Sequence, residues 1–314
     1  MRIAAVILCL PVCLLATLRA AEDDDEPAQR GKFQTLNVNQ LERRYILRAP
    51  GDLKPGELLP VVFVFHGGSG NAAGMERLSK FTPLAETERF IVVYPEGVEK
   101  NWNDGRTLEK SRAHRENLDD VGFINALLDK LLKENSADPR RIYACGISNG
   151  AIFSHRLGME LSARIAAIAG VCGSLAEALE DKFAPANPVS VLIINGDDDP
   201  MAPYNGGEIT FKRGRISSTD DTIKKWVQAN GCDASGTKGE PLDKVRRDGT
   251  RVLTTTWSGG RAKTEVVLMK VEGGGHTWPG GNQYLPELVI GKTSREFDAT
   301  ATLWEFFKRH AKAK

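Results

Sequence analysis

The chain has 314 residues, of which 41% are hydrophobic and 26% are charged, the balance of an ordinary globular protein. Its 42 basic and 41 acidic residues nearly cancel, which excludes the basic surplus typical of nucleic-acid-binding proteins. The length is compatible with one large α/β domain, and no Pro-rich or Gly/Ser-rich linker divides the sequence.

The N-terminus has the order of parts of a secretory signal peptide. Arg2 precedes an uncharged apolar run over residues 3–18, and the small residues Ala20 and Ala21 precede an acidic stretch. The alternative is an uncleaved membrane anchor, but the run is short for a membrane span. We therefore expect a signal peptide at 1–21, an acidic and polar segment at 22–40 and one catalytic domain at 41–314. The mature form is expected to be secreted or periplasmic, with no membrane attachment.

Strand-like and helix-like segments alternate from about residue 40 onward. The strands are short, nearly continuous apolar runs, and the helices have apolar residues at helical spacing. This alternation predicts a mostly parallel central sheet with helices on both faces, whose ligands bind at the carboxyl ends of the strands. The expected strands are 43–49, 61–67, 90–95, 141–146, 165–171, 191–196 and 263–271, and the expected helices are 119–135, one from about 149, and 300–312.

A candidate nucleophile lies between a predicted strand and a predicted helix, in the sequence CGISNG. Gly146, Ser148 and Gly150 form a G-x-S-x-G motif, in which a sharp turn exposes the serine above the sheet. The backbone N–H of Asn149 then faces the oxyanion that forms during acyl transfer. A second donor is expected from the glycine-rich loop after strand 61–67, where Gly67 and Gly68 are both candidates.

A histidine and an acid should follow the serine in the chain, since this motif belongs to the order Ser, Asp or Glu, His. His276 follows the last strand in a glycine-rich loop and satisfies both order and location. For the acid, Asp197, Asp198 and Asp199 all follow the strand 191–196, and local reasoning does not separate them. The carboxylate has to accept the imidazole N–H and stabilise the imidazolium.

Three cysteines remain after removal of the signal peptide: Cys145, Cys172 and Cys232. One disulfide with a free thiol and no disulfide are both compatible with this number. No His, Cys or carboxylate residues stand at the spacing of a metal site, so we expect no metal and no cofactor.

Several motifs together resemble the secreted polyhydroxybutyrate depolymerase-like and feruloyl esterase family of α/β-hydrolases. They run from RRYILRAP and VVFVFHGGSGN through NWNDGR, DDVGF, CGISNG and NGDDDPMAPYNGG to EGGGHTWPGG and LWEFF. The resemblance implies the α/β-hydrolase fold and selects Asp199 as the acid, with Ser148 and His276 as its partners. The family's usual histidine and valine around the acid are replaced by Asn195 and Ala202.

Other residues near the predicted strand ends have two interpretations each. Trp102 and Trp278 are candidate walls for a substrate ring or acyl chain, or they pack the loops. Asp119 and Asp120 are expected to pair with Arg106 and to hold its loop.

These features predict a serine ester hydrolase that acts through an acyl-enzyme. The expected substrates are small or oligomeric esters, such as feruloyl or acetyl esters of polysaccharide or hydroxyalkanoate oligomers, because no spare length is evident for a polyester-binding domain. A serine peptidase on the same fold and a catalytically inactive binding protein are the rival interpretations. No nucleic-acid partner is expected, and the oligomeric state is left open.

Overall fold

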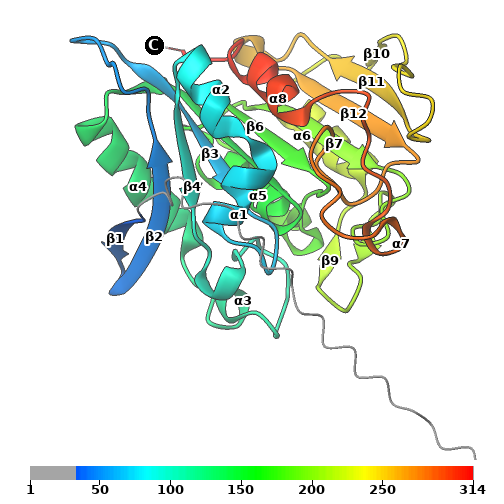
Figure 1. Ribbon diagram of the computed structural model, residues 1–314, viewed down its shortest axis with the longest axis horizontal. Helices are drawn as coiled ribbons and strands as arrows, with labels where there is room; N and C mark the ends of the chain where they lie inside the picture. The colour runs from blue at the N-terminus through cyan, green and yellow to red at the C-terminus, as the bar shows by residue number, and fades with distance from the viewer. Residues whose placement is uncertain (1–32, 314) are drawn as a thin grey trace, which may run out of the picture. The chain divides into compact units, whose positions relative to one another are not determined.

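The computed structural model describes residues 33–313. The centre of this part of the chain is a ten-stranded sheet (Figure 1). Its central strands are parallel, as the sequence predicts, while the strands at its two edges are antiparallel. In spatial order the strands are β1 (Gln34–Val38), β2 (Leu41–Arg48), β4 (Ile91–Pro95), β3 (Leu59–Phe65), β5 (Ala137–Ile147), β6 (Ala167–Val171), β7 (Ser190–Gly196), β12 (Val266–Glu272), β11 (Arg251–Trp257) and β10 (Thr237–Lys238).

Helices cover both faces of this sheet. Along β3, alternate side chains enter two different cores, with Val62 and Val64 in one and Val61, Phe63 and Phe65 in the other. Burial on both faces explains why this strand is a continuous apolar run. The first core contains α1 (Ala72–Ser79), α2 (Phe81–Glu88) and α8 (Ala299–Phe307), in front of the sheet in Figure 1, and the second contains α4 (Asp120–Glu134), α5 (Asn149–Glu160) and α6 (Thr219–Asn230).

The remaining elements are short. They are α3 (Arg112–Arg115), α7 (Glu287–Ile290), the two-stranded sheet of β8 (Gly207–Glu208) and β9 (Arg215–Ile216), and 3₁₀ turns at Val98–Lys100, Glu177–Lys182 and Arg261–Lys263.

Side-chain caps fix where the longer helices begin. Asp119 accepts a hydrogen bond from the Gly122 N–H at the start of α4, and Ser218 accepts one from the Asp221 N–H at the start of α6. Asp119 therefore caps a helix and does not pair with Arg106.

The sheet begins earlier than the expected domain boundary at residue 41. Gln34–Val38 pairs with β2 through a tight turn in which Asn39 and Gln40 both have positive φ. β1 is mostly exposed on the sheet edge, so it lacks the apolar run by which the inner strands are found. The predicted signal peptide at 1–21 lies outside the described residues. Over residues 33–313, no helix has both the length and the apolar character needed to cross a membrane.

Candidate active site

Ser148 occupies the turn between β5 and α5, with φ 57° and ψ −120°. This backbone conformation is unfavourable for a residue with a side chain, and it is typical of a nucleophile elbow. A Cβ atom at Gly146 would lie 2.6 Å from the Phe65 carbonyl oxygen, and one at Gly150 would lie 2.7 Å from that of His66. Both glycines are therefore required for the close approach of the elbow to β3.

His276 and Asp199 meet through a short hydrogen bond. The His276 Nδ1 atom lies 2.7 Å from Asp199 Oδ2, and the two side chains are 8% and 1% exposed. The other oxygen of Asp199 accepts the backbone N–H groups of Met201 and Ala202, at 2.7 and 2.9 Å. These bonds fix the carboxylate, and they leave Nε2 of His276 as the nitrogen that can exchange a proton with a substrate or a nucleophile.

The other two members of the acidic cluster have different partners. Asp197 accepts the N–H of Gly273 and lies 3.1 Å from the Lys270 ammonium, and Asp198 is exposed. The structure thus brings only one of the three aspartates, Asp199, to His276.

The loop that carries His276 is held by the segment that follows it in the chain. The N–H of His276 donates to Ile290 O at 2.5 Å, and the N–H of Gly275 donates to Lys292 O at 2.9 Å. The Tyr284 hydroxyl donates to His276 O at 2.6 Å. These hydrogen bonds hold the backbone of the histidine loop against the segment 284–292.

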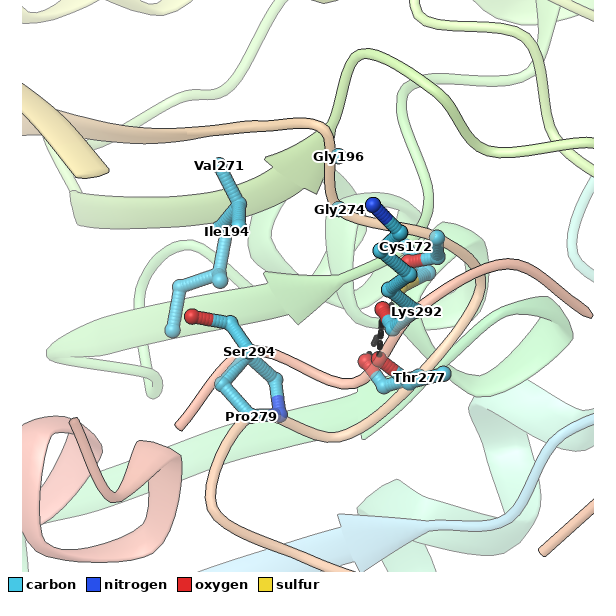
Figure 2. A pocket seen from close by; sticks show the side chains of 10 residues that line it. Cys172, Ile194, Gly196, Val271, Gly274, Thr277, Pro279, Lys292 and Ser294 are labelled. Atoms are coloured by element: carbon cyan, nitrogen blue, oxygen red, sulfur yellow. Dashed lines mark hydrogen bonds between the residues drawn. The ribbon is translucent and has the colours of Figure 1, made fainter. Parts of the chain in front are cut away.

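Cys172 connects the elbow to this histidine loop. The Ser148 N–H donates to Val171 O at 2.9 Å, and the next residue, Cys172, places its Sγ 3.1 Å from Thr277 O. Figure 2 shows Cys172, Thr277 and Lys292 among the residues that line a small pocket beside this loop. No hydrogen bond joins Ser148 Oγ to His276 in the described part of the chain. Such bonds are often long before substrate binds.

Candidate oxyanion donors lie beside the elbow. Over residues 33–313, the N–H groups of Gly67 and Gly68 donate to no protein acceptor. The N–H of Asn149 belongs to the first turn of α5, where no intrahelical acceptor is available. A Cβ at Gly67 would lie 3.3 Å from Ser148 Cβ, and one at Gly68 would lie 3.8 Å from Asn149 Cβ. Both glycines therefore adjoin the elbow, and both stay candidates.

The two tryptophans do not form walls of an open cleft. Trp102 is 0% exposed, stacks on Phe153 with ring centroids 5.2 Å apart, and donates its Nε1–H to His66 O. Trp278 is 1% exposed and donates its Nε1–H to Thr300 Oγ1. The structure contradicts the substrate-facing interpretation, because protein atoms cover both rings, and it supports the packing interpretation.

Asp104 and Asp120 organise the loop that contains Trp102. Asp104 is fully buried and pairs with Arg106, whereas Asp120 pairs with Arg43 at 2.6 Å. The expected partnership of Arg106 with Asp119 or Asp120 is therefore wrong. Asp104 also accepts the Asn149 side-chain amide at 2.6 Å.

Buried histidines in polar segments were not evident from the sequence. His114, in the polar stretch KSRAHREN, is buried and bonds Asp104 through Nε2 at 2.8 Å. His310, near the C-terminus, bonds Ser190 and Glu265. No apolar periodicity around His114 indicates burial, whereas His310 continues the helical spacing of Leu303 and Phe307.

One group of potential metal ligands in residues 33–313 lies at the candidate site itself. The three cysteines of residues 33–313 are Cys145, Cys172 and Cys232, and all three are free thiols. In residues 33–313, one group of possible ligand atoms is found, in Cys172, Asp199 and His276, within 4.8 Å of one another. Burial, together with the nearby Asp199 charge, raises the pKa of the Cys172 thiol, so it stays protonated.

An exposed apolar patch lies on the segment after His276. Leu288 is 96% exposed, and Tyr284, Leu285 and Val289 are also exposed. Exposed apolar side chains gathered on one short segment are typical of a binding surface.

Comparisons with known proteins show that the chain is similar to esterases. No protein-family model matches the chain. The chain is 31% identical over 274 residues to the protein named "Putative esterase NocK" of Nocardia uniformis subsp. tsuyamanensis, covering 84% of this chain and 78% of that protein. It is 26% identical to feruloyl esterase C of Emericella nidulans, covering 88% and 89%. It is 27% identical to feruloyl esterase B of Piromyces equi, over 74% of this chain and 42% of that longer protein.

Solved esterase structures share the fold. A thermostable esterase matches with a TM-score of 0.56 and 18% identity, over 90% of this chain and 63% of the other. The acetyl xylan esterase from Aspergillus awamori matches with a TM-score of 0.55 and 16% identity, over 79% and 94%. Together with the mostly parallel sheet covered by helices, these matches identify the α/β-hydrolase fold.

Proposed function

We propose that this chain, which belongs to the esterase family that includes NocK and the feruloyl esterases, hydrolyses carboxylic esters with Ser148 as its nucleophile. His276 acts as the general base, and Asp199 orients it. The observation that carries the proposal is the 2.7 Å hydrogen bond between His276 Nδ1 and Asp199, in a chain whose Ser148 has the strained elbow conformation.

The reaction proceeds in two steps. His276 Nε2 removes the Ser148 proton as Oγ attacks the ester carbonyl, and the oxyanion is bound by the N–H of Asn149 and that of Gly67 or Gly68. His276 then protonates the departing alcohol, which leaves an acyl-enzyme. Water attacks the acyl group with the same assistance and releases the acid. Each oxyanion donor contributes about 3 kcal/mol to transition-state stabilisation.

Single substitutions test the nucleophile and the base. Ser148→Ala and His276→Ala should each lower the turnover of p-nitrophenyl acetate by at least about 10⁴-fold. Ser258→Ala is the matched control, because Ser258 is exposed in a glycine-rich loop. Because protein groups and water supply the whole reaction, EDTA should not change turnover. Wild-type activity in either triad variant refutes the assignment.

For the substrate, we propose esters with an aromatic or other apolar acyl group, including feruloyl esters of polysaccharide and hydroxyalkanoate oligomers. The exposed apolar patch of Tyr284, Leu285, Leu288 and Val289 supports this, since its segment contacts the backbone of His276. Methyl ferulate, acetylated xylan and hydroxybutyrate oligomers compared by kcat/KM test it. A preference for acetylated xylan over both apolar substrates would contradict the proposal.

We further propose that the enzyme is exported after cleavage of residues 1–21, and that one catalytic domain follows. The apolar run over 3–18 and the small residues Ala20 and Ala21 support cleavage. N-terminal sequencing of the protein recovered from the periplasm or the medium is the test. An intact Met1 on the recovered protein would contradict it.

A further inference from the structure

We propose that Asp104 is a positioning residue for the oxyanion hole, acting through the side chain of Asn149. The inference rests on the proposed function, in which the Asn149 backbone N–H is one of the oxyanion donors. Asp104 touches neither the nucleophile nor the base, and nothing in its sequence context, NWNDGR, indicates such a role.

The Asn149 side chain is held at both of its polar atoms. Its Oδ1 accepts the Trp102 N–H at 2.8 Å, and its Nδ2 donates to Trp102 O at 3.0 Å and to Asp104 Oδ2 at 2.6 Å. Asn149 is the residue directly after Ser148 and the first residue of α5. Fixing its side chain therefore fixes the peptide whose N–H has to meet the oxyanion.

Asn149 also adjoins the other candidate donor. A Cβ at Gly68 would lie 3.8 Å from Asn149 Cβ. The asparagine thus lies between the glycine-rich loop and the loop that carries Asp104. A displaced Asn149 would disturb the geometry on both sides of the oxyanion.

Two buried side chains, those of Arg106 and His114, hold the Asp104 carboxylate in place. The Arg106 guanidinium lies 2.7 Å from Oδ2, and His114 Nε2 lies 2.8 Å from Oδ1, with side chains that are 5% and 3% exposed. Burial alone would raise the pKa of Asp104, but Arg106 and His114 outweigh it and lower this pKa well below its usual range. The carboxylate is therefore ionised whenever the enzyme is folded at neutral pH.

The negative charge of Asp104 is balanced by its buried neighbour Arg106. The Arg106 guanidinium lies 2.7 Å from the Asp104 carboxylate, so the two opposite charges balance each other. The cluster can hold Asn149 without repelling the negative charge that develops beside it.

The test compares Asp104→Asn with Asp120→Asn. Asp120 is a matched control because it is also a buried carboxylate, pairs with an arginine (Arg43), and accepts the neighbouring Asn103 N–H at 2.7 Å, but does not contact Asn149. Turnover of p-nitrophenyl acetate is measured per serine labelled by a fluorophosphonate, which corrects for misfolded protein. Asn149→Ala removes the contact with Asp104 together with both hydrogen bonds to Trp102, and it leaves the Asp104–Arg106 pair in place.

We expect kcat per labelled serine to fall about 10- to 100-fold in Asp104→Asn and in Asn149→Ala, with KM changed less than about threefold. Asp120→Asn should lower Tm yet keep kcat per labelled serine within about threefold. Wild-type kcat in Asn149→Ala, or an equal loss in Asp120→Asn, overturns the role of Asp104. Absence of label on wild-type Ser148 would instead refute the proposed function.

Discussion

Gly150→Ala should damage activity through geometry alone, because it adds one methyl group away from every reacting atom. The new Cβ would lie 2.7 Å from His66 O and closer still to Phe65 O, both of which are backbone atoms of the strand end before the oxyanion loop. Restoring an ordinary contact of 3.4 Å to His66 O requires a movement of about 0.7 Å between α5 and β3, and the closer Phe65 O requires a larger one. Displacements of this size cost about 10- to 100-fold in kcat/KM.

Gly158→Ala on the same helix is the control. Its Cβ would meet side chains and no backbone of the sheet, 2.9 Å from Ile168 Cδ1 and 3.2 Å from Trp226 Cη2. The gain in helix propensity of about 1 kcal/mol then offsets part of the repacking. We expect Gly158→Ala to keep kcat/KM within about threefold, and Gly150→Ala also to lose about 1–3 kcal/mol of unfolding free energy. Wild-type kcat/KM with p-nitrophenyl acetate and unchanged Tm in Gly150→Ala would refute the reasoning.

Three further results are expected. Asp199→Asn should lower kcat on the order of 10⁴-fold, because an amide favours the tautomer of His276 that cannot accept the serine proton; a loss under tenfold would contradict the assignment. Burial lowers the pKa of His155 to about 4, so the unfolded chain binds its proton first and unfolding free energy falls by about 3 kcal/mol as pH drops from 7 to 4. In His155→Gln, which keeps an acceptor for Trp226 Nε1, the unfolding free energy should fall less between pH 7 and pH 4. Urea titrations at the two pH values measure this difference. Of the three cysteines in residues 33–313, iodoacetamide should modify only Cys232 in the native protein, because Cys145 and Cys172 are buried; mass spectrometry of the peptides is the measurement.

The inner strands were predictable because burial on both faces demands continuous apolar runs. β3 and β7 are buried at every residue, and the sequence predicts both. β11 was missed because three consecutive threonines, Thr254 to Thr256, interrupt its apolar pattern near the sheet edge. The short β1 was missed for a similar reason.

The site was predictable where a motif joins residue type to backbone geometry. The turn at Ser148 needs its flanking glycines, so the sequence pattern carries the structure. The choice of Asp199 depended on family resemblance, since all three aspartates follow the same strand. Its contact with His276 arises from loops that local sequence does not describe.

The sequence did not predict which loop residues are buried. Trp102 was compatible with a cleft or a core, and only the packing of Phe153 and Phe65 on its ring distinguishes them. The pairing of Asp104 with Arg106 and His114 joins three polar residues of one loop region, without any periodicity to indicate that they are buried.

The central claim is that Ser148 is the nucleophile, and covalent labelling tests it most directly. Native enzyme is treated with a fluorophosphonate, and the modified residue is identified by peptide mass spectrometry while residual esterase activity is followed. We predict one adduct per chain, on Ser148, with activity lost in proportion to labelling. Full inactivation with the adduct on another residue, or full activity with Ser148 completely modified, would contradict the account.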